Sequence, residues 1–196
     1  RQAALAGGVA AAVALGISEL VAGLLPGATS LVAAVGQVVI DLQPPGAKDL
    51  VVALFGPNDK VALELFVAGV AVAIGAGAGI VAIRSFAIAM ASFVAFGIVG
   101  FIASLGDQLA NPTIVAASVA LSVGGGLQIL GWLLDRATRD VATGTDETRA
   151  TTEGASPARR SFLLRSAGLA VAAIAAGFTG RTLLDRARTA PSDGVD

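Results

Sequence analysis

The stretch Val61–Leu105, VALELFVAGVAVAIGAGAGIVAIRSFAIAMASFVAFGIVGFIASL, decides the fold class of this chain. It contains two apolar blocks, Val61–Ile83 and Phe86–Leu105, and each is close to the roughly 20 residues that a helix needs to cross a hydrocarbon core. Only Arg84 and Ser85 separate them, which allows nothing but a helical hairpin. Lipid offers no partner for unpaired backbone groups, and the blocks are too long and too continuously apolar for barrel strands. The stretch therefore predicts two transmembrane helices.

The composition of the whole chain agrees with this prediction. Of 196 residues, 55% are hydrophobic and 14% are charged, and the mean hydropathy is +0.82, far above the balance of a soluble domain. Cysteine and histidine are both absent, which removes the usual ligands of haem, iron–sulfur clusters, copper and structural zinc. We therefore expect no cofactor and no metal in this chain. The net charge of -1, without a basic stripe, predicts no nucleic-acid partner.

Three further apolar blocks of spanning length lie outside the hairpin: Ala3–Leu25, Thr113–Leu134 and Phe162–Leu184. With the hairpin, they predict an all-α integral membrane protein, a helical bundle of five spans in contact with the lipid bilayer.

Two short apolar runs, Ser30–Ile40 and Leu50–Phe55, follow the first span and flank a Pro44-Pro45-Gly46 breaker. The first run is only about half a span in length. We interpret the pair as short interfacial or re-entrant helices at one membrane face. The alternative is one strained full span, which would invert the first span.

The arginines of the short loops predict the orientation. Arg84 and the arginines after the fourth span share one side with the N-terminus, and the positive-inside rule makes that side cytoplasmic. The C-terminus is then extracytoplasmic, although Arg186 and Arg188 run against the rule, and the membrane is the cytoplasmic (inner) membrane. The predicted organisation is a four-span bundle at 1–134 with an extracytoplasmic segment at 30–56, a polar cytoplasmic linker at 135–160, a final span at 161–184 and an extracytoplasmic tail at 185–196.

The last span begins with a basic pair and two large apolar residues: Arg159, Arg160, Phe162 and Leu163. This pattern resembles a twin-arginine export signal, which the twin-arginine translocase reads from the cytoplasm. Ala158 stands where Ser or Thr is usual, and Arg165 lies one place beyond the expected basic residue. The alternative is an ordinary basic flank that obeys the positive-inside rule. No clear cleavage site follows, so we expect the span to remain as an anchor.

The segment Gly16–Leu63, with SELVAGL and VIDLQPPGAKDLVVALFGPNDK, resembles the membrane region of actinobacterial molybdopterin-dependent oxidoreductases of the sulfite-oxidase-like family. The order of features continues to RRSFLLRSAG. The resemblance implies a non-catalytic transmembrane anchor for an exported domain that follows the last span and binds molybdopterin through a cysteine thiolate. It transfers no catalytic residue to this cysteine-free chain, whose tail is too short to be that domain. Either the polypeptide continues, or the chain is a shortened relative.

Two other functions stay open. The chain is alternatively an accessory or assembly subunit of a larger membrane complex, such as a respiratory complex, and docks onto other membrane subunits through faces of small residues. A transporter or proton channel is the weaker alternative, because the chain has no repeated halves. Contact with quinone would require an apolar cleft.

Glu19 is the leading intramembrane candidate, because an ionisable residue in a span marks a functional site by default. It lies in the last third of the first span, where its carboxylate can reach water, Lys48 or Lys60. One interpretation is proton or quinone chemistry. The other is a brace for the loop of Asp41 and Pro44-Pro45 through backbone N–H groups.

The remaining polar residues of the spans predict structural roles. Gln37 and Gln128 predict hydrogen bonds between helices, worth about 1 kcal/mol or less each. Glu64 falls in the first turn of its span, where the helix dipole favours an anion. Small residues predict three faces for close helix packing. They are made by Gly75 and Gly79, by Gly8, Ala12 and Gly16, and by Ser118, Ser122 and Gly126.

Overall fold

The computed structural model describes residues 1–42, 59–147 and 157–189. Within these ranges every element is a helix, and five of the helices are long and apolar enough to cross a membrane. The prediction of an all-α, multi-pass membrane bundle is confirmed. The helices are α1 (Gln2–Leu24), α2 (Leu31–Asp41), α4 (Asp59–Ala82), α5 (Phe86–Ser104), α6 (Pro112–Glu147) and α7 (Pro157–Thr189).

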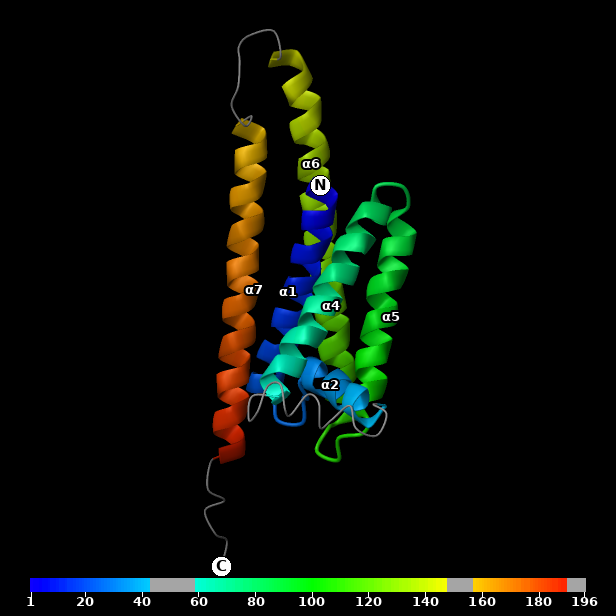
Figure 1. Ribbon diagram of the computed structural model, residues 1–196, viewed down its shortest axis with the longest axis vertical. Helices are drawn as coiled ribbons and strands as arrows, with labels where there is room; N and C mark the ends of the chain where they lie inside the picture. The colour runs from blue at the N-terminus through cyan, green and yellow to red at the C-terminus, as the bar shows by residue number, and fades with distance from the viewer. Residues whose placement is uncertain (43–58, 148–156, 190–196) are drawn as a thin grey trace, which may run out of the picture.

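Successive spans run in opposite directions (Figure 1). The N-terminus, the turn between α4 and α5 and the start of α7 lie toward one end of the bundle. The other end, called the α2 end below, holds α2, the loop between α5 and α6 and the C-terminal end of α7.

Helix α1 is the centre of the bundle. It packs against α4, α6 and α7, and 50% of its spanning window is buried, against 28% or less for the other spans. Its buried positions are mostly Gly and Ala, which allow neighbouring backbones to approach closely. The buried core around α1 includes Ala6, Ala10, Phe93, Leu130 and Phe162.

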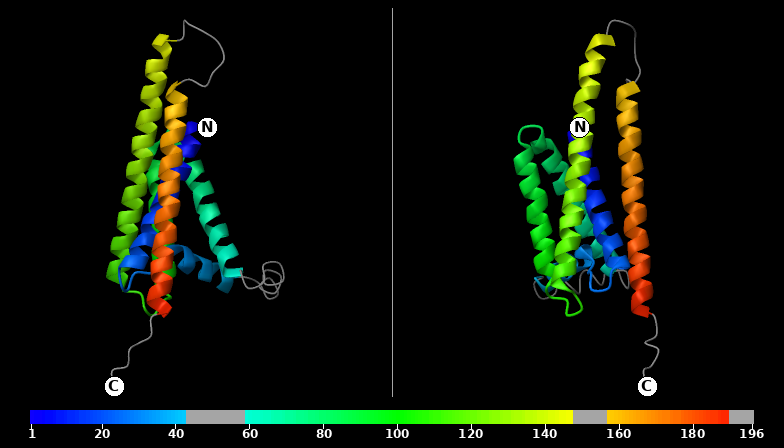
Figure 2. Two further views of the ribbon diagram at one scale, coloured as in Figure 1. Left: turned by 90° about the vertical axis from the view of Figure 1, so that its left-hand side faces the viewer. Right: turned by 180° about the vertical axis from the view of Figure 1, so that it is seen from behind.

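Helix α1 ends and helix α4 begins at the same end of the bundle, the α2 end (Figure 1). Ala3 of α1 lies against Gly79 of α4, and Ala11 lies against Gly75, so the two helices are antiparallel. Helix α2 is 11 residues long, or about 16 Å, roughly half of a hydrocarbon core. It lies across the α2 end (Figure 2). This geometry fits the interfacial interpretation of the first short run; the predicted second short run, at 50–55, lies outside the described residues.

Helix α6 continues well past the predicted end of its span. Asn111 caps its start, since its side-chain oxygen accepts the backbone N–H of Thr113 at 3.0 Å, and Pro112 is the favoured first residue. Beyond Leu134 the helix gains the ion pair of Asp135 with Arg139 at 2.5 Å. The guanidinium of Arg136 also stacks on Trp132, 4.9 Å from the ring centroid. Contacts of this spacing support helix outside lipid, so the segment predicted as a polar linker begins as a helix.

Candidate functional site: a polar junction at the α2 end

Glu19 of α1 and Ser30 form the most buried polar contact of the described chain. Glu19 is only 8% exposed, and its carboxylate accepts a hydrogen bond from the Ser30 hydroxyl at 2.7 Å. The same hydroxyl accepts the backbone N–H of Ala33 at 3.1 Å and thereby caps the start of α2. The Ser30 side chain thus joins the C-terminal part of α1 to the first turn of α2.

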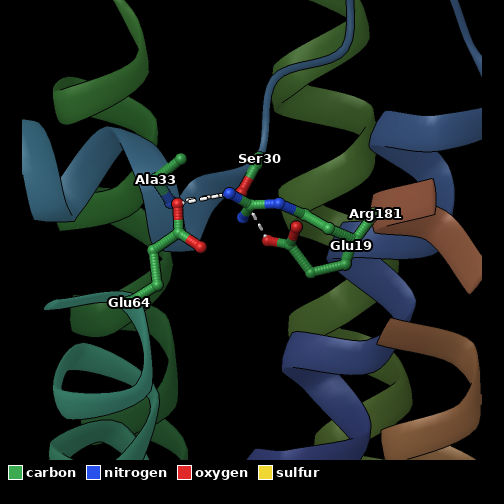
Figure 3. A network of polar contacts seen from close by, with 5 residues as sticks. All are labelled: Glu19, Ser30, Ala33, Glu64 and Arg181. Carbon is green, nitrogen blue, oxygen red and sulfur yellow. Dashed lines mark hydrogen bonds and ion pairs between the residues drawn. The ribbon is translucent and has the colours of Figure 1, made fainter. Parts of the chain in front are cut away.

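An ion pair between α4 and α7 lies beside this contact. The guanidinium of Arg181 donates to the carboxylate of Glu64, and its charge also attracts Glu19. Figure 3 shows the Arg181 side chain reaching past Ser30 between the two carboxylates. Glu19, Ser30, Glu64 and Arg181 are called the polar junction below. They bring together α1, α2, α4 and α7.

The charges of the polar junction compensate one another in part. One guanidinium faces two carboxylates, and the capped N-terminus of α2 adds positive potential next to Glu19. Charged side chains in membrane helices are costly unless they are paired or hydrated, and here each has a partner within the chain. The described residues contain no group of three or more Asp or Glu side chains that could hold a metal ion. The contacts of the polar junction hold α1, α2, α4 and α7 together at the α2 end.

A second set of contacts ties neighbouring loops at the same end. Thr29 donates to a carboxylate oxygen of Asp107 at 3.3 Å, and the backbone N–H of Asn111 donates to the carbonyl of Gly27 at 2.8 Å. Gly27 has a φ of 84°, a left-handed conformation that glycine adopts without strain. The turn after α1 is therefore fixed against the loop between α5 and α6.

Glu19 has a structural partner different from the ones that the sequence suggests. It braces the start of α2 through Ser30 and faces Arg181. Of the predicted partners, Lys48 and the Pro44-Pro45 breaker lie outside the described residues, as does the side chain of Lys60. The bracing interpretation named this kind of role, and the contact with the Pro44-Pro45 segment stays a prediction.

Gln37 makes a hydrogen bond within its own helix in the structure. Its amide donates to Asp41 at 3.0 Å, one turn along α2, and both side chains are exposed among the described residues. Gln128 is exposed on α6 and makes no hydrogen bond with the described part of the chain.

The small-residue faces lie at helix contacts. A Cβ atom on Gly79 would lie 2.8 Å from the Cα atom of Gly7, so α1 and α4 touch through their backbones, and Gly75 belongs to the same contact. Gly126 of α6 meets Ala14 of α1. Ser118 and Ser122 are buried, and their hydroxyls have no hydrogen-bond partner among the described residues.

The residues of the twin-arginine-like motif lie in the first turns of α7, far from the polar junction. Phe162 is buried in the core at 1% exposure, whereas Leu163 is 43% exposed. Arg160 is also exposed. The side chain of Arg159 is outside the described part.

Sequence reasoning missed Arg181. This arginine lies near the end of the last apolar block, and a charge at such a place requires a counter-ion. Its position in the sequence could therefore have indicated an ion pair. Glu64 could be placed only at a helix start, because nothing in a single sequence says that α4 and α7 meet.

Neither family models nor curated proteins nor solved structures give a match to this chain. The polar junction and the sequence motifs therefore carry the functional proposal.

Proposed function

We propose that this chain is a non-catalytic transmembrane anchor, which holds an exported molybdopterin-dependent oxidoreductase domain of the sulfite-oxidase type at the outer face of the cytoplasmic membrane. The supporting observation is the attachment of α7 at its C-terminal end, from which such a domain would emerge. There Arg181 pairs with Glu64, and Gly180 lies against the backbone of Glu19 and Leu20.

The distribution of arginines supports an orientation for the anchor. Arg84, Arg136 and Arg139 lie toward the end of the bundle opposite the α2 end, and the positive-inside rule places arginine-rich loops in the cytoplasm. The N-terminus is then cytoplasmic, and the α2 end and the C-terminus are extracytoplasmic. The start of α7 faces the cytoplasm, where the twin-arginine translocase reads its signals. Molybdopterin belongs to the exported domain.

Export of a folded reporter tests the anchor. A fluorescent protein fused after Asp196 folds before translocation, and we expect protease added to spheroplasts to degrade it. Replacing Arg159 and Arg160 together with Lys should keep the reporter inside and lower the degraded fraction at least about tenfold. Arg165→Lys, on the same helix, is the matched control and should leave export unchanged.

Two outcomes distinguish a twin-arginine signal from an ordinary basic flank. Loss of export in cells without the twin-arginine translocase supports the anchor. Full export of the double lysine variant would reject it, because the arginine pair would then be only a basic flank.

An exposed small-residue face favours a second candidate, the accessory subunit of a larger membrane complex. Gly69, Ala73 and Gly77 lie one turn apart on α4 and are exposed, and a Cβ atom on Gly69 or Gly77 would meet nothing within 4 Å. Such faces allow close helix contacts. Gly77→Leu should then abolish stoichiometric co-purification with a partner subunit after gentle solubilisation, whereas Gly168→Leu, at an equally open position on α7, should not. A monodisperse free chain would count against this candidate.

A further inference from the structure

Arg165 of α7 lies at the level of Trp132 of α6, toward the end of the bundle opposite the α2 end. Two contacts between small residues fix the registers of α6 and α7 on α1: Gly126 against Ala14, and Ala173 against Gly16. Helix α7 runs parallel to α1, and α6 runs antiparallel to it (Figure 1). Counting eight residues back along α1 and α7 pairs Gly8 with Arg165, and counting six residues along α1 and α6 pairs Gly8 with Trp132. Arg165 and Trp132 therefore lie within about one helical turn of each other in depth.

Arg165 lies on the flank of α7 that faces α6. At about 100° per residue, Arg165 and Arg181 fall roughly 80° to either side of the face of Ala173 and Gly180 that contacts α1. Arg181 pairs with Glu64 of α4. Arg165 is therefore turned away from α4 and toward α6, which runs beside α7 at this end of the bundle (Figure 2).

Arg136 lies on the flank of α6 that faces away from α5. Gly131 lies against Phe86 of α5, and Leu133 is buried in the core. On the helical wheel, Gly131 and Arg136 fall on opposite sides of Leu133. Helix α6 packs against α1, α5 and α7, so the flank away from α5 is the one beside α7. The guanidinium of Arg136 stacks on Trp132, 4.9 Å from the ring centroid, which keeps its charge at the level of that ring.

Neither guanidinium has a carboxylate partner in the described part of the chain. Arg165 is exposed and makes no hydrogen bond or ion pair with the described residues, and Arg136 only stacks on Trp132. Asp135, the one carboxylate among the described side chains of this end, is already paired with Arg139. An arginine in a spanning helix is costly without a counter-charge or water. An anion bound at this level would supply the missing counter-charge.

Two side chains of α6 place this level at the lipid headgroups. Trp132 is 39% exposed, and tryptophan prefers the interface between membrane and water. Gln128 lies one turn, about 6 Å, nearer the membrane centre; it is exposed, and its amide has no hydrogen-bond partner among the described residues. The polar region of a bilayer is roughly 5–8 Å thick on each side, with the ester carbonyls of the phospholipids at its inner edge. The Gln128 amide is thus at the depth of the ester carbonyls when the guanidinium groups are at the depth of the phosphates.

We propose that Arg136 and Arg165 bind the phosphate of one anionic phospholipid, with an ester carbonyl of the same lipid accepting a hydrogen bond from Gln128. Arginine holds phosphate oxygens through paired, charge-assisted hydrogen bonds. A zwitterionic headgroup would add an ammonium group beside two guanidinium groups, and like charges repel. The four residues Gln128, Trp132, Arg136 and Arg165 are called the headgroup site below.

The headgroup site is independent of the anchor function, because it needs neither export nor a further domain. The proposed export signal is read at Arg159 and Arg160. Loss of lipid binding by an Arg165 variant therefore leaves export unchanged, and the two proposals fail separately.

Native mass spectrometry of the chain in detergent tests the site, with dioleoyl phosphatidylglycerol as the probe. We expect saturable binding of one molecule per chain, at least about tenfold tighter than that of dioleoyl phosphatidylcholine, which has the same tails and a zwitterionic headgroup. Soluble glycerol phosphate should not compete at equal concentration, because it lacks the ester carbonyls and the tails. Arg136→Gln combined with Arg165→Gln should raise the Kd for phosphatidylglycerol at least about tenfold.

Arg1→Gln combined with Arg84→Gln is the charge-matched control. Both arginines are exposed and lie toward the same end of the bundle (Figure 1), but neither belongs to the headgroup site, so this pair should bind phosphatidylglycerol normally. Gln128→Leu leaves both guanidinium groups in place and should raise the Kd by about threefold. Melting temperatures in lipid-free detergent report folding, and phosphatidylglycerol should raise the melting temperature of the control pair but not that of the Arg136 and Arg165 double variant.

Four results would overturn the proposal. Absence of saturable binding would leave Arg165 to water. Equal binding of phosphatidylcholine would make the contact a general lipid contact. An equal loss of binding in the control pair would show a diffuse basic surface instead of a site, and competition by glycerol phosphate at equal concentration would show a site for free phosphate.

Discussion

Ser30 is the residue on which both the polar junction and the start of α2 depend. Its hydroxyl donates to Glu19 and accepts from Ala33, so Ser30→Ala removes a helix cap and leaves a buried carboxylate with one partner fewer. We expect the free energy of unfolding in detergent to fall by about 1–2 kcal/mol. Ser85→Ala is the control, because Ser85 precedes α5 without a side-chain capping bond, and it should cost less than about 0.5 kcal/mol. Equal losses in the two variants would show that the contact with Glu19 contributes nothing.

The pair of Glu64 and Arg181 calls for a double-mutant cycle, because each side chain is partly exposed, 20% and 32%. Partly exposed ion pairs are worth less than buried ones, and we expect a coupling energy of about 1 kcal/mol. Arg181→Gln should destabilise the chain more than Glu64→Gln does, since it leaves both Glu64 and Glu19 without their guanidinium. Arg165→Gln, at an exposed place on the same helix, should change stability little. Additive losses in the cycle would reject the junction as a coupled unit.

At the scale of elements, backbone contact between α1 and α7 determines how the last span is held. A Cβ atom on Gly16 would lie 2.6 Å from the carbonyl oxygen of Ala173, and this neighbour is backbone, which cannot rotate away. We expect Gly16→Val to lower the stability by about 1–3 kcal/mol through overpacking. Gly168→Val on α7, where a Cβ atom would meet nothing within 4 Å, should be nearly neutral. Thermal unfolding of both variants in the same detergent checks this difference, and equal stability would show that α7 is not held through this contact.

The number of spanning helices could be predicted from the sequence, whereas the end of α6 could not. Length and apolar composition alone determine that five helices are long enough to cross, and the breakers around 26–27 and 106–112 define their ends. The end of α6 could not be predicted, because hydropathy marks where lipid stops and not where helix stops. The ion pair of Arg139 with Asp135 adds a small stabilisation to the helix beyond the apolar block. The candidate site was half predicted: Glu19 stands out by its charge, whereas Ser30 and Arg181 become its partners only through tertiary packing.

At the scale of the whole molecule, the orientation can be tested directly on residues 1–196 expressed alone, because they contain no cysteine. Arg84→Cys lies in the turn between α4 and α5, and Gln108→Cys lies in the exposed loop between α5 and α6, at opposite ends of the bundle. A membrane-impermeant maleimide is added to intact cells that carry one variant or the other. With the positive-inside orientation, it should label the Gln108→Cys variant strongly and the Arg84→Cys variant only after the membrane is permeabilised, with a contrast of about tenfold. Leu105→Cys is the control for loop exposure, since it precedes the same loop and should follow Gln108→Cys. The reverse pattern would place the start of α7 outside the cytoplasm, where no translocase could read its arginines, and both the orientation and the anchor function would have to be abandoned.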